Sequence, residues 1–468
     1  MKDALINRNL LHLYRRACFG GLPEKDISVR KAVSVLFRES ESYQPIRVVR
    51  SEPEALPTVD AMASANNEEV KKDRMKKSRE EIRELNVVWM ANMVNGKASL
   101  RERMAFFWHG HFACRVQNSA FVERYLNTIR KNALGSFSDL LMEVSREPAM
   151  LQFLNNQQNR KNKPNENFAR EVMELFTLGR GYYSENDIKE GARAFRGWGF
   201  DDIGNFQFRE KFHDDKEKVF LGKTGNFRGE DVIKILLEQK QTARFITIKL
   251  YKEFVSETPD EQRINLLAED FYHSNYDIGK LMRTIFSADW FYENASKNIL
   301  IKSPVELVIG IQKTLGAAEF IEKEPVLYIQ KVLGQVLFYP PNVAGWPGGR
   351  NWIDSSSLLF RMNLPNLMAG VTTQKIKAKE SGDVNDQAVK RKGENAKITV
   401  DWVKWASRFE KISDDKLPAF LSNELLAVQP KPDVMNLIVE NNKDIPDRPD
   451  RIRKLTLAIM GLPEYQIS

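Results

Sequence analysis

Two histidines are the first residues in this sequence whose type and spacing could support chemistry. His109 and His111 are flanked by aromatic residues in the segment Phe107-Trp-His-Gly-His-Phe112. In a continuous helix their side chains point about 200° apart, and His111 joins the apolar core. If Gly110 interrupts the helix, both imidazoles can face one metal ion, because neutral imidazole is a common metal ligand. The structural alternative is that each is a buried histidine with satisfied hydrogen bonds.

Two glutamates and a basic stripe form a second candidate group. Glu171 and Glu174 are three residues apart on a predicted helix within Asn165–Gly179, at the margin of its apolar face. A carboxylate at such a margin needs a cation, a hydrogen-bond donor or a proton. The pair could ligate a metal with one of the histidines, or act as a general acid and base. The structural alternative is ion pairing with the basic stripe of the next helix, formed by Lys189, Arg193 and Arg196.

The elements that must position these residues are predicted to be helices. Apolar residues recur at helical spacing along most of the chain, so we expect a mainly α fold with one large multi-helix domain. Capping boxes at Ser78-Arg-Glu-Glu81, Ser99-Leu-Arg-Glu102 and Ser303-Pro-Val-Glu306 indicate three helix starts. One small β-hairpin is expected at residues 206–221, where Phe206 and Phe208 alternate with polar residues. His213-Asp-Asp215 would form its tip.

Composition shifts suggest how the chain is divided. We expect a helical core domain over residues 1–370, with a mobile insertion near residues 41–77. Residues 371–399 are rich in Lys, Glu and Asn and poor in large apolar side chains, so they are predicted to be a charged flexible segment. Residues 400–468 are expected to form a C-terminal helical cap.

Composition also limits the classes of partner and compartment. The 468 residues include 27 Phe and 8 Trp, ample for a buried core, and the net charge of +8 is modest for this length. No nucleic-acid-binding motif accompanies the charge, so we expect no nucleic-acid partner. No apolar run is long enough to span a membrane. The two cysteines argue against a disulfide framework, and the first 20 residues lack a signal peptide, so we predict a soluble cytoplasmic protein.

Further polar and aromatic residues are expected to contact a ligand. Asn165 and Asn167 precede the glutamate helix, as an N-terminal cap or as a polar rim beside free N–H groups. The Pro- and Gly-rich loop Pro340–Trp352 carries tryptophans and an arginine that suit a sugar or an anion, although a Pro/Trp corner packed on the core is the structural alternative. His213-Asp-Asp215 could contribute metal ligands from a loop, although a hairpin turn alone explains Asp and His there. The complete set of expected ligand contacts is Asn165, Asn167, Arg170, Arg196, Trp198, His213, Asp214, Trp346, Arg350 and Trp352.

Several segments together resemble the bacterial domain of unknown function 1800 family. The matching segments are Phe107–Phe112, Glu147-Pro-Ala-Met-Leu151, Asn165–Glu171, Glu174–Gly179, Tyr183–Asp187, Ala192–Trp198, His213-Asp214 and Pro340–Trp352. The resemblance implies no established activity. Many members carry His at the position of Phe176 and an Asp-Asn pair at Asn155-Asn156, which weakens any mechanism that needs those groups. Many members are also exported, whereas this chain shows no signal.

These observations predict a metal-dependent, hydrolase-like enzyme with a His/Glu/Arg pocket for a small molecule or saccharide. His109, His111 and Glu171 would ligate a divalent metal. Glu174 would be the base, and His109 and Arg193 would be the other catalytic residues, with Arg193 holding an anionic intermediate or substrate. The alternative is a non-catalytic binding or assembly protein. In that case the same charges form a structural network, and the Trp346–Trp352 loop meets a protein partner.

Overall fold

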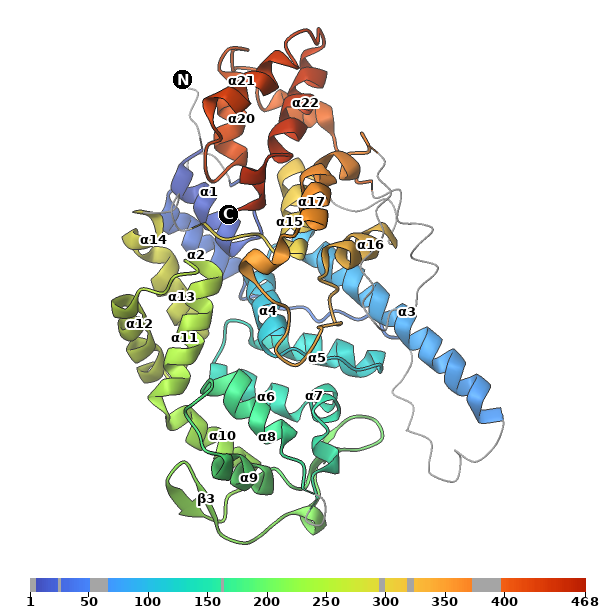
Figure 1. Ribbon diagram of the computed structural model, residues 1–468, viewed down its shortest axis with the longest axis vertical. Coiled ribbons are helices and arrows are strands. Elements are labelled where there is room, and N and C mark those ends of the chain that lie inside the picture. Colours follow the sequence, from blue (N-terminus) through green and yellow to red (C-terminus); the bar gives the residue numbers. More distant parts are fainter. Residues whose placement is uncertain are drawn as a thin grey trace.

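The computed structural model describes residues 6–23, 27–50, 66–160, 164–293, 299–317, 324–372 and 397–468 (Figure 1). Within these ranges the chain is mainly helical, with two small antiparallel sheets, so the predicted fold class is confirmed. The middle of the expected insertion and most of the expected flexible segment (residues 371–399) lie outside the described residues.

Helix α4 is the element around which the first half of the chain packs. The helices of this half are α1 (Arg8–Ala17), α2 (Val29–Glu39), α3 (Asn66–Asn95), α4 (Ser99–His111), α5 (Ser119–Asn132), α6 (Phe137–Arg146) and α7 (Pro148–Phe153). Helix α4 contacts α1, α2, α3 and α5, and most of its residues are buried (Figure 1). A helix buried on every side must neutralise its charges internally. Glu102 does so by binding Arg130 at 2.6 Å and the indole N–H of Trp89 at 2.9 Å.

One of the predicted helix starts is wrong, and a second lacks its predicted capping box. Helix α3 begins at Asn66, so Ser78 lies inside it. The Ser78 hydroxyl accepts a hydrogen bond from the backbone N–H of Ser119 at 2.8 Å, outside its own helix. Helix α4 begins at Ser99 as predicted, but its N-cap residue is Ala98, which has no capping side chain, and Glu102 is engaged in the core. The third predicted start is confirmed: Ser303 and Glu306 form a reciprocal capping box.

The expected insertion near residues 41–77 is ordered at both ends. Residues 66–77 belong to α3. Before the undescribed part, the chain lies along α5, where the backbone N–H groups of Ile46 and Val48 donate to Asn127 and Glu123 at 2.9 and 2.5 Å. Only residues 51–65 of this segment lie outside the described residues.

The middle of the chain changes from helix to sheet and back. Its elements are η2 (Asn156–Gln158), α8 (Asn167–Glu171), η3 (Val172–Thr177), α9 (Glu185–Ala194), β1 (Trp198–Phe200), β2 (Phe206–Phe208), η4 (Glu210–Phe212), β3 (Lys218–Phe220), β4 (Lys223–Gly225) and α10 (Gly229–Glu238). Element η3 is a π-helix that continues α8, so the predicted Asn165–Gly179 helix is wound differently in its second half. Such π segments occur frequently at functional sites.

The predicted single hairpin at residues 206–221 is two hairpins. Strand β2 pairs with the preceding β1, and β3 pairs with the following β4. The chain reverses at Asp201, whose carboxylate accepts from the N–H of Asn205 at 2.7 Å, and again at Leu221-Gly222, both with positive φ. Because these two turns flank the expected hairpin, His213-Asp-Asp215 lies in the connection between sheets instead of at a tip.

The last part of the chain adds a further set of helices and a terminal helical group. Its elements are α11 (Lys240–Phe254), α12 (Glu261–His273), α13 (Ile278–Ser287), α14 (Asp289–Glu293), α15 (Pro304–Leu315), α16 (Glu324–Leu333), η5 (Gly349–Trp352), α17 (Ser355–Met368), α19 (Trp402–Ser407), α20 (Leu417–Leu425), α21 (Pro432–Glu440), α22 (Arg448–Met460) and η7 (Pro463–Gln466). Helices α19, α20 and α21 all pack on α22, and α20–α22 group at one end of the molecule (Figure 1). Every helix in the described ranges is too short or too polar to cross a lipid bilayer.

Candidate active site

The imidazole of His111 links helix α4 to two other elements. Its Nε2 lies 3.3 Å from the carbonyl oxygen of Phe176 in η3, and its Nδ1 lies 3.0 Å from Nζ of Lys249 in α11. A carbonyl oxygen can only accept, so Nε2 carries the hydrogen and Nδ1 accepts from Lys249. Burial, together with the nearby cation of Lys249, holds the pKa of His111 well below its ordinary value. The ring is therefore a fixed, neutral hydrogen-bonding group.

Lys249 is a partly buried amine held by the π-helix. Besides His111, it donates to the carbonyl oxygen of Leu175 at 3.3 Å. Leu175 and Phe176 lie in the last turn of η3, where backbone carbonyls lack partners within the helix, so they can accept from these two side chains. Burial lowers the pKa of Lys249 to about 8, because the charged ammonium is less well solvated here than in water.

His109 occupies an aromatic cage on a different face of α4. Its Nε2 accepts from the backbone N–H of Phe338 at 3.3 Å, so Nδ1 carries the hydrogen. That N–H has no acceptor among the described residues. The ring lies 5.2 Å from the rings of Trp89, Phe338 and Trp346 and is stacked on Trp346. Burial lowers the pKa of His109 to about 3, which keeps it neutral.

Arg103, one or two turns before the histidines on α4, binds two carboxylates. Its Nη2 lies 2.8 Å from Glu253 on α11 and 2.8 Å from Glu306 at the start of α15. The guanidinium is 3% exposed and lies over the ring of Phe254. Burial raises the pKa of Glu253, and the neighbouring carboxylate of Glu306 raises it further. Glu306 is oriented by the backbone N–H of Ser303, which donates to it at 2.8 Å.

These groups line one cavity of about 650 Å³ between α4, α11, the start of α15 and the Pro340–Trp352 loop. The walls include Arg103, His109, His111, Lys249, Lys252, Glu253, Glu306, Trp346, Arg350 and Trp352. The loop lies against α4 through two glycines, since a Cβ at Gly345 would meet the carbonyl oxygen of Gly110 at 2.5 Å. This close approach positions Trp346 on His109.

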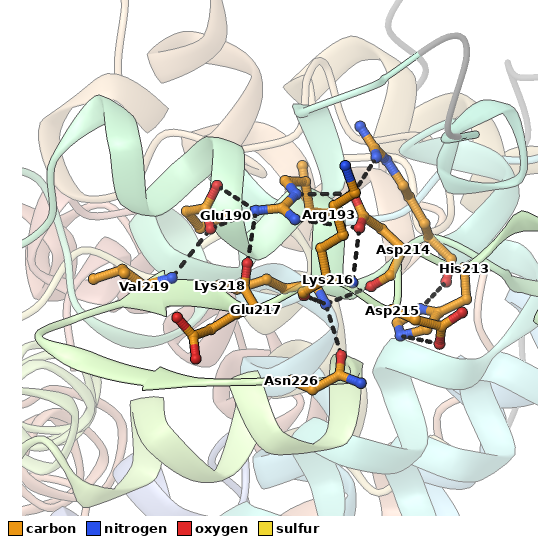
Figure 2. Close-up of polar contacts among 12 residues, drawn as sticks. Glu190, Arg193, His213, Asp214, Asp215, Lys216, Glu217, Lys218, Val219 and Asn226 are labelled. Atoms are coloured by element: carbon orange, nitrogen blue, oxygen red, sulfur yellow. Dashed lines mark hydrogen bonds and ion pairs between the residues drawn. The ribbon is translucent and has the colours of Figure 1, made fainter.

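A second polar cluster joins α9 to the connection between the sheets (Figure 2). Arg193 donates to Asp214 at 2.9 Å and to Glu190 at 2.8 Å, and Arg196 donates to the same Asp214 at 2.8 Å. Hydrogen bonds from Arg193, more than any other cause, hold the pKa of Asp214 well below its ordinary value. His213 contacts the carbonyl oxygen of Arg196 through Nδ1 at 3.1 Å. The charges of this cluster are therefore paired mainly with one another.

The glutamate pair has different partners from those predicted. Glu174 accepts from the hydroxyl of Tyr183 and from Nε of Arg180, both at 2.5 Å. Those bonds, led by that from Tyr183, lower the pKa of Glu174. Glu171 is half-buried, and burial followed by the charge of Glu174 raises its pKa. The predicted ion pairing of these carboxylates with the α9 arginines is wrong, because Arg193 binds Glu190 and Asp214.

Comparison with known protein families identifies the family of this chain. The model of the family described as "Protein of unknown function (DUF1800)" matches residues 12–467. The chain belongs to the DUF1800 family. No curated protein and no solved structure matches it.

In this DUF1800 chain the residues predicted to share one pocket are divided among separate places. His109, His111, Trp346, Arg350 and Trp352 all line the cavity. Arg193, Arg196, His213 and Asp214 form the second cluster. In the part of the chain that the structure describes, no three His, Cys, Asp or Glu side chains are grouped to hold a metal ion, so His109, His111 and Glu171 are not brought together.

The other predicted ligand contacts have local partners. Asn165 accepts from the backbone N–H of Asn167 at 3.0 Å, and Asn167 donates to Leu154 at 3.3 Å. Arg170 forms a double hydrogen bond with Glu185 at 3.0 Å. Trp198 is 1% exposed and packs among Phe168, Phe195 and Phe206.

Sequence reasoning missed most of the charged residues of the cavity, among them Arg103, Lys249, Glu253 and Glu306. One signal was available, because Lys249 and Glu253 are four residues apart and therefore share a face of a predicted helix with apolar neighbours. Glu306 was already explained as a capping residue, and that role hid its second contact with Arg103.

Proposed function

We propose that this protein is a hydrolase-like enzyme that acts on a small saccharide-like molecule bound in the cavity, with Glu253 and Glu306 as its catalytic carboxylates. The observation that carries the proposal is that these two side chains share one nitrogen of Arg103 inside a cavity with an aromatic wall. Paired carboxylates beside the scissile bond are the usual machinery for glycoside hydrolysis.

The two carboxylates have different surroundings, as an acid and its partner require. The raised pKa of Glu253 favours a protonated carboxyl, which can donate to a leaving-group oxygen. Glu306 accepts from both Arg103 and the backbone N–H of Ser303, which fix the position of its carboxylate. A carboxylate fixed beside the acid is positioned to attack the sugar carbon or to stabilise a developing positive charge.

The spacing of the pair favours a direct attack by the carboxylate. Since Glu253 and Glu306 each lie 2.8 Å from the same nitrogen, their bound oxygens are no farther apart than twice that distance. Enzymes that place a water between their carboxylates hold them about 6.5–9.5 Å apart, whereas a nucleophile and an acid lie about 5–5.5 Å apart. The geometry therefore supports the retaining type.

The size and lining of the cavity suit a monosaccharide unit. Its volume of about 650 Å³ is typical of small-molecule sites. Trp346 and Trp352 provide apolar ring surface, and Arg350 provides donors at the rim. The Nδ1–H of His109 is buried beside the cavity and has no acceptor among the described residues. The metal-dependent version of a hydrolase draws no support from the separate positions of His109, His111 and Glu171.

The second candidate function is a binding or assembly protein. The α9 cluster favours it, because Arg193 and Arg196 are neutralised by Glu190 and Asp214 as in a purely structural network. This observation concerns a cluster outside the cavity and leaves the carboxylate pair unexplained.

A panel of p-nitrophenyl glycosides tests the proposal, with release of p-nitrophenol as the readout. We expect the wild-type chain to hydrolyse at least one member and Glu306→Gln to lose at least about 100-fold in kcat/KM. Glu269→Gln changes an exposed surface ion pair on α12 and is the matched control. If no glycoside is hydrolysed faster by the wild type than by Glu306→Gln, the proposal is wrong.

A further inference from the structure

The amine of Lys249 is a chemical group in the same cavity that the proposed hydrolysis does not use. It projects from α11 one turn before Glu253 and lines the cavity wall. In the described part of the chain it forms no ion pair with a carboxylate, so no anion stabilises its protonated form. Its contacts are instead two hydrogen-bond acceptors and the ring of Phe245, whose centre lies 4.9 Å away.

The hydrogen bonds of the Lys249 nitrogen leave its lone pair free. A neutral amine has two N–H bonds and one lone pair. His111 Nδ1 accepts one hydrogen at 3.0 Å, and the carbonyl oxygen of Leu175 accepts the other at 3.3 Å. The direction of both bonds is settled, because Leu175 offers a carbonyl and His111 is held in the Nε2–H tautomer by Phe176. The lone pair is therefore the one feature of the amine left for a ligand in the cavity.

We propose that Lys249 is a nucleophile that binds an aldehyde or ketone covalently as an imine. The lone pair attacks the carbonyl carbon, forming the N–C bond. One N–H proton passes from the nitrogen to the carbonyl-derived oxygen. The nitrogen then loses its second proton as the C–O bond breaks, and both hydrogens leave with that oxygen as water. The sum is amine plus carbonyl giving imine plus water, with no oxidant or reductant.

Three features favour this chemistry over a passive lysine. The pKa of about 8 leaves a substantial neutral fraction near physiological pH. His111 is buried, neutral and held by Phe176, so its Nδ1 fixes the position of the amine in the cavity wall. The cavity is large enough for a small carbonyl compound, and the amine of Lys249 lies in its wall.

Reductive trapping tests the proposal directly. The full-length chain is incubated with glycolaldehyde and cyanoborohydride at pH 8, digested, and analysed by mass spectrometry for the reduced adduct on each lysine. Lys249 is expected to be labelled at least ten times faster than Lys252, which lines the same cavity, and than Lys131, whose side chain is 58% exposed. The labelling rate of Lys249 should rise as pH increases from 7 to 9.

Two variants separate nucleophilicity from accessibility. Lys249→Arg should remove the fast-labelled site and leave Lys252 labelling unchanged. His111→Gln, with an unchanged circular dichroism spectrum, should slow Lys249 labelling at least tenfold while the lysine is still present. Labelling of Lys249 no faster than that of Lys252 and Lys131 in the wild type overturns the proposal, whatever the variants do. Glycoside hydrolysis is measured separately, so failure of one proposal does not affect the other.

Discussion

Glu253 and Glu306 lie at the same distance, 2.8 Å, from a single nitrogen of Arg103, although they belong to different helices. Arg103 is itself buried among Phe19, Phe106 and Phe254. A buried guanidinium needs anionic partners, and two carboxylates this close need a cation. The three side chains therefore depend on one another, and they form one wall of the cavity.

Removing the cation should destabilise the fold. Arg103→Met would leave two carboxylates side by side without their shared cation, and we expect the free energy of unfolding to fall by about 3–5 kcal/mol in urea denaturation. Arg180→Met is the control, because Arg180 is 87% exposed and its pairing with Glu174 is screened by solvent. Equal stability of the two variants would contradict the buried triad.

The close contact between the Pro340–Trp352 loop and α4 requires glycine at position 345. Gly345 has φ +83°, and a Cβ there would lie 2.5 Å from the carbonyl oxygen of Gly110. Gly345→Ala should therefore displace the loop, reduce stability by about 1–3 kcal/mol and increase the exposure of Trp346. Tryptophan fluorescence and thermal melting measure both effects. Gly348→Ala, where no atom lies within 4 Å of the new Cβ, should change neither.

The buried histidines predict a loss of stability in acid. His109 is neutral in the folded state, where burial lowers its pKa to about 3, but its ordinary value is 6.5. Below pH 6.5 the unfolded chain therefore binds a proton at this residue, while the folded chain does not. The contribution of neutral His109 to the free energy of unfolding is complete above pH 6.5 and falls as pH drops toward 3.

Urea denaturation between pH 7 and 5 measures this contribution. Relative to the wild type, His109→Gln should lose less stability on acidification, by up to about 1.4 kcal/mol per pH unit. His273→Gln, which changes an exposed histidine, should follow the wild type. Parallel pH profiles for His109→Gln and the wild type would show that His109 is accessible to protons in the folded protein.

The second cluster should matter for stability and not for chemistry. Asp214→Asn removes the carboxylate that Arg193 and Arg196 share, and we expect a loss of about 1–3 kcal/mol with unchanged glycoside hydrolysis. The neighbouring Asp215→Asn is the matched control, because the Asp215 side chain is 78% exposed. Loss of hydrolysis in folded Asp214→Asn would place the active site at this cluster instead of in the cavity.

The mainly helical fold could be predicted because helix formation leaves a local, periodic pattern. The capping box at Ser303 is an example in which neighbouring residues alone determine the element. The hairpin prediction failed because alternating residues predict strands but not which strands pair, and the turns at Asp201–Asn205 and Leu221-Gly222 decided the pairing.

The site could be predicted only in part, for a similar reason. His109, His111 and the Trp346–Trp352 loop stand out by composition, and they do line one cavity. Lys249 and Glu253 meet them through packing between helices distant in the sequence, which periodicity does not encode. Glu171 and Glu174 were predicted to act as a pair. Arg180 and Tyr183, only a few residues later, instead donate hydrogen bonds to Glu174.

The most direct test of the central claim, that Glu253 is the general acid of an active site in this cavity, is the dependence of rate on the leaving group. We predict that Glu253→Gln hydrolyses a phenyl glycoside at least about 100-fold more slowly than the wild type, because that leaving group needs a proton. On the 2,4-dinitrophenyl glycoside of the same sugar, whose leaving group needs no proton, the variant should keep most of its rate of bond cleavage. An equal loss on both substrates, or no loss on either, would contradict the account.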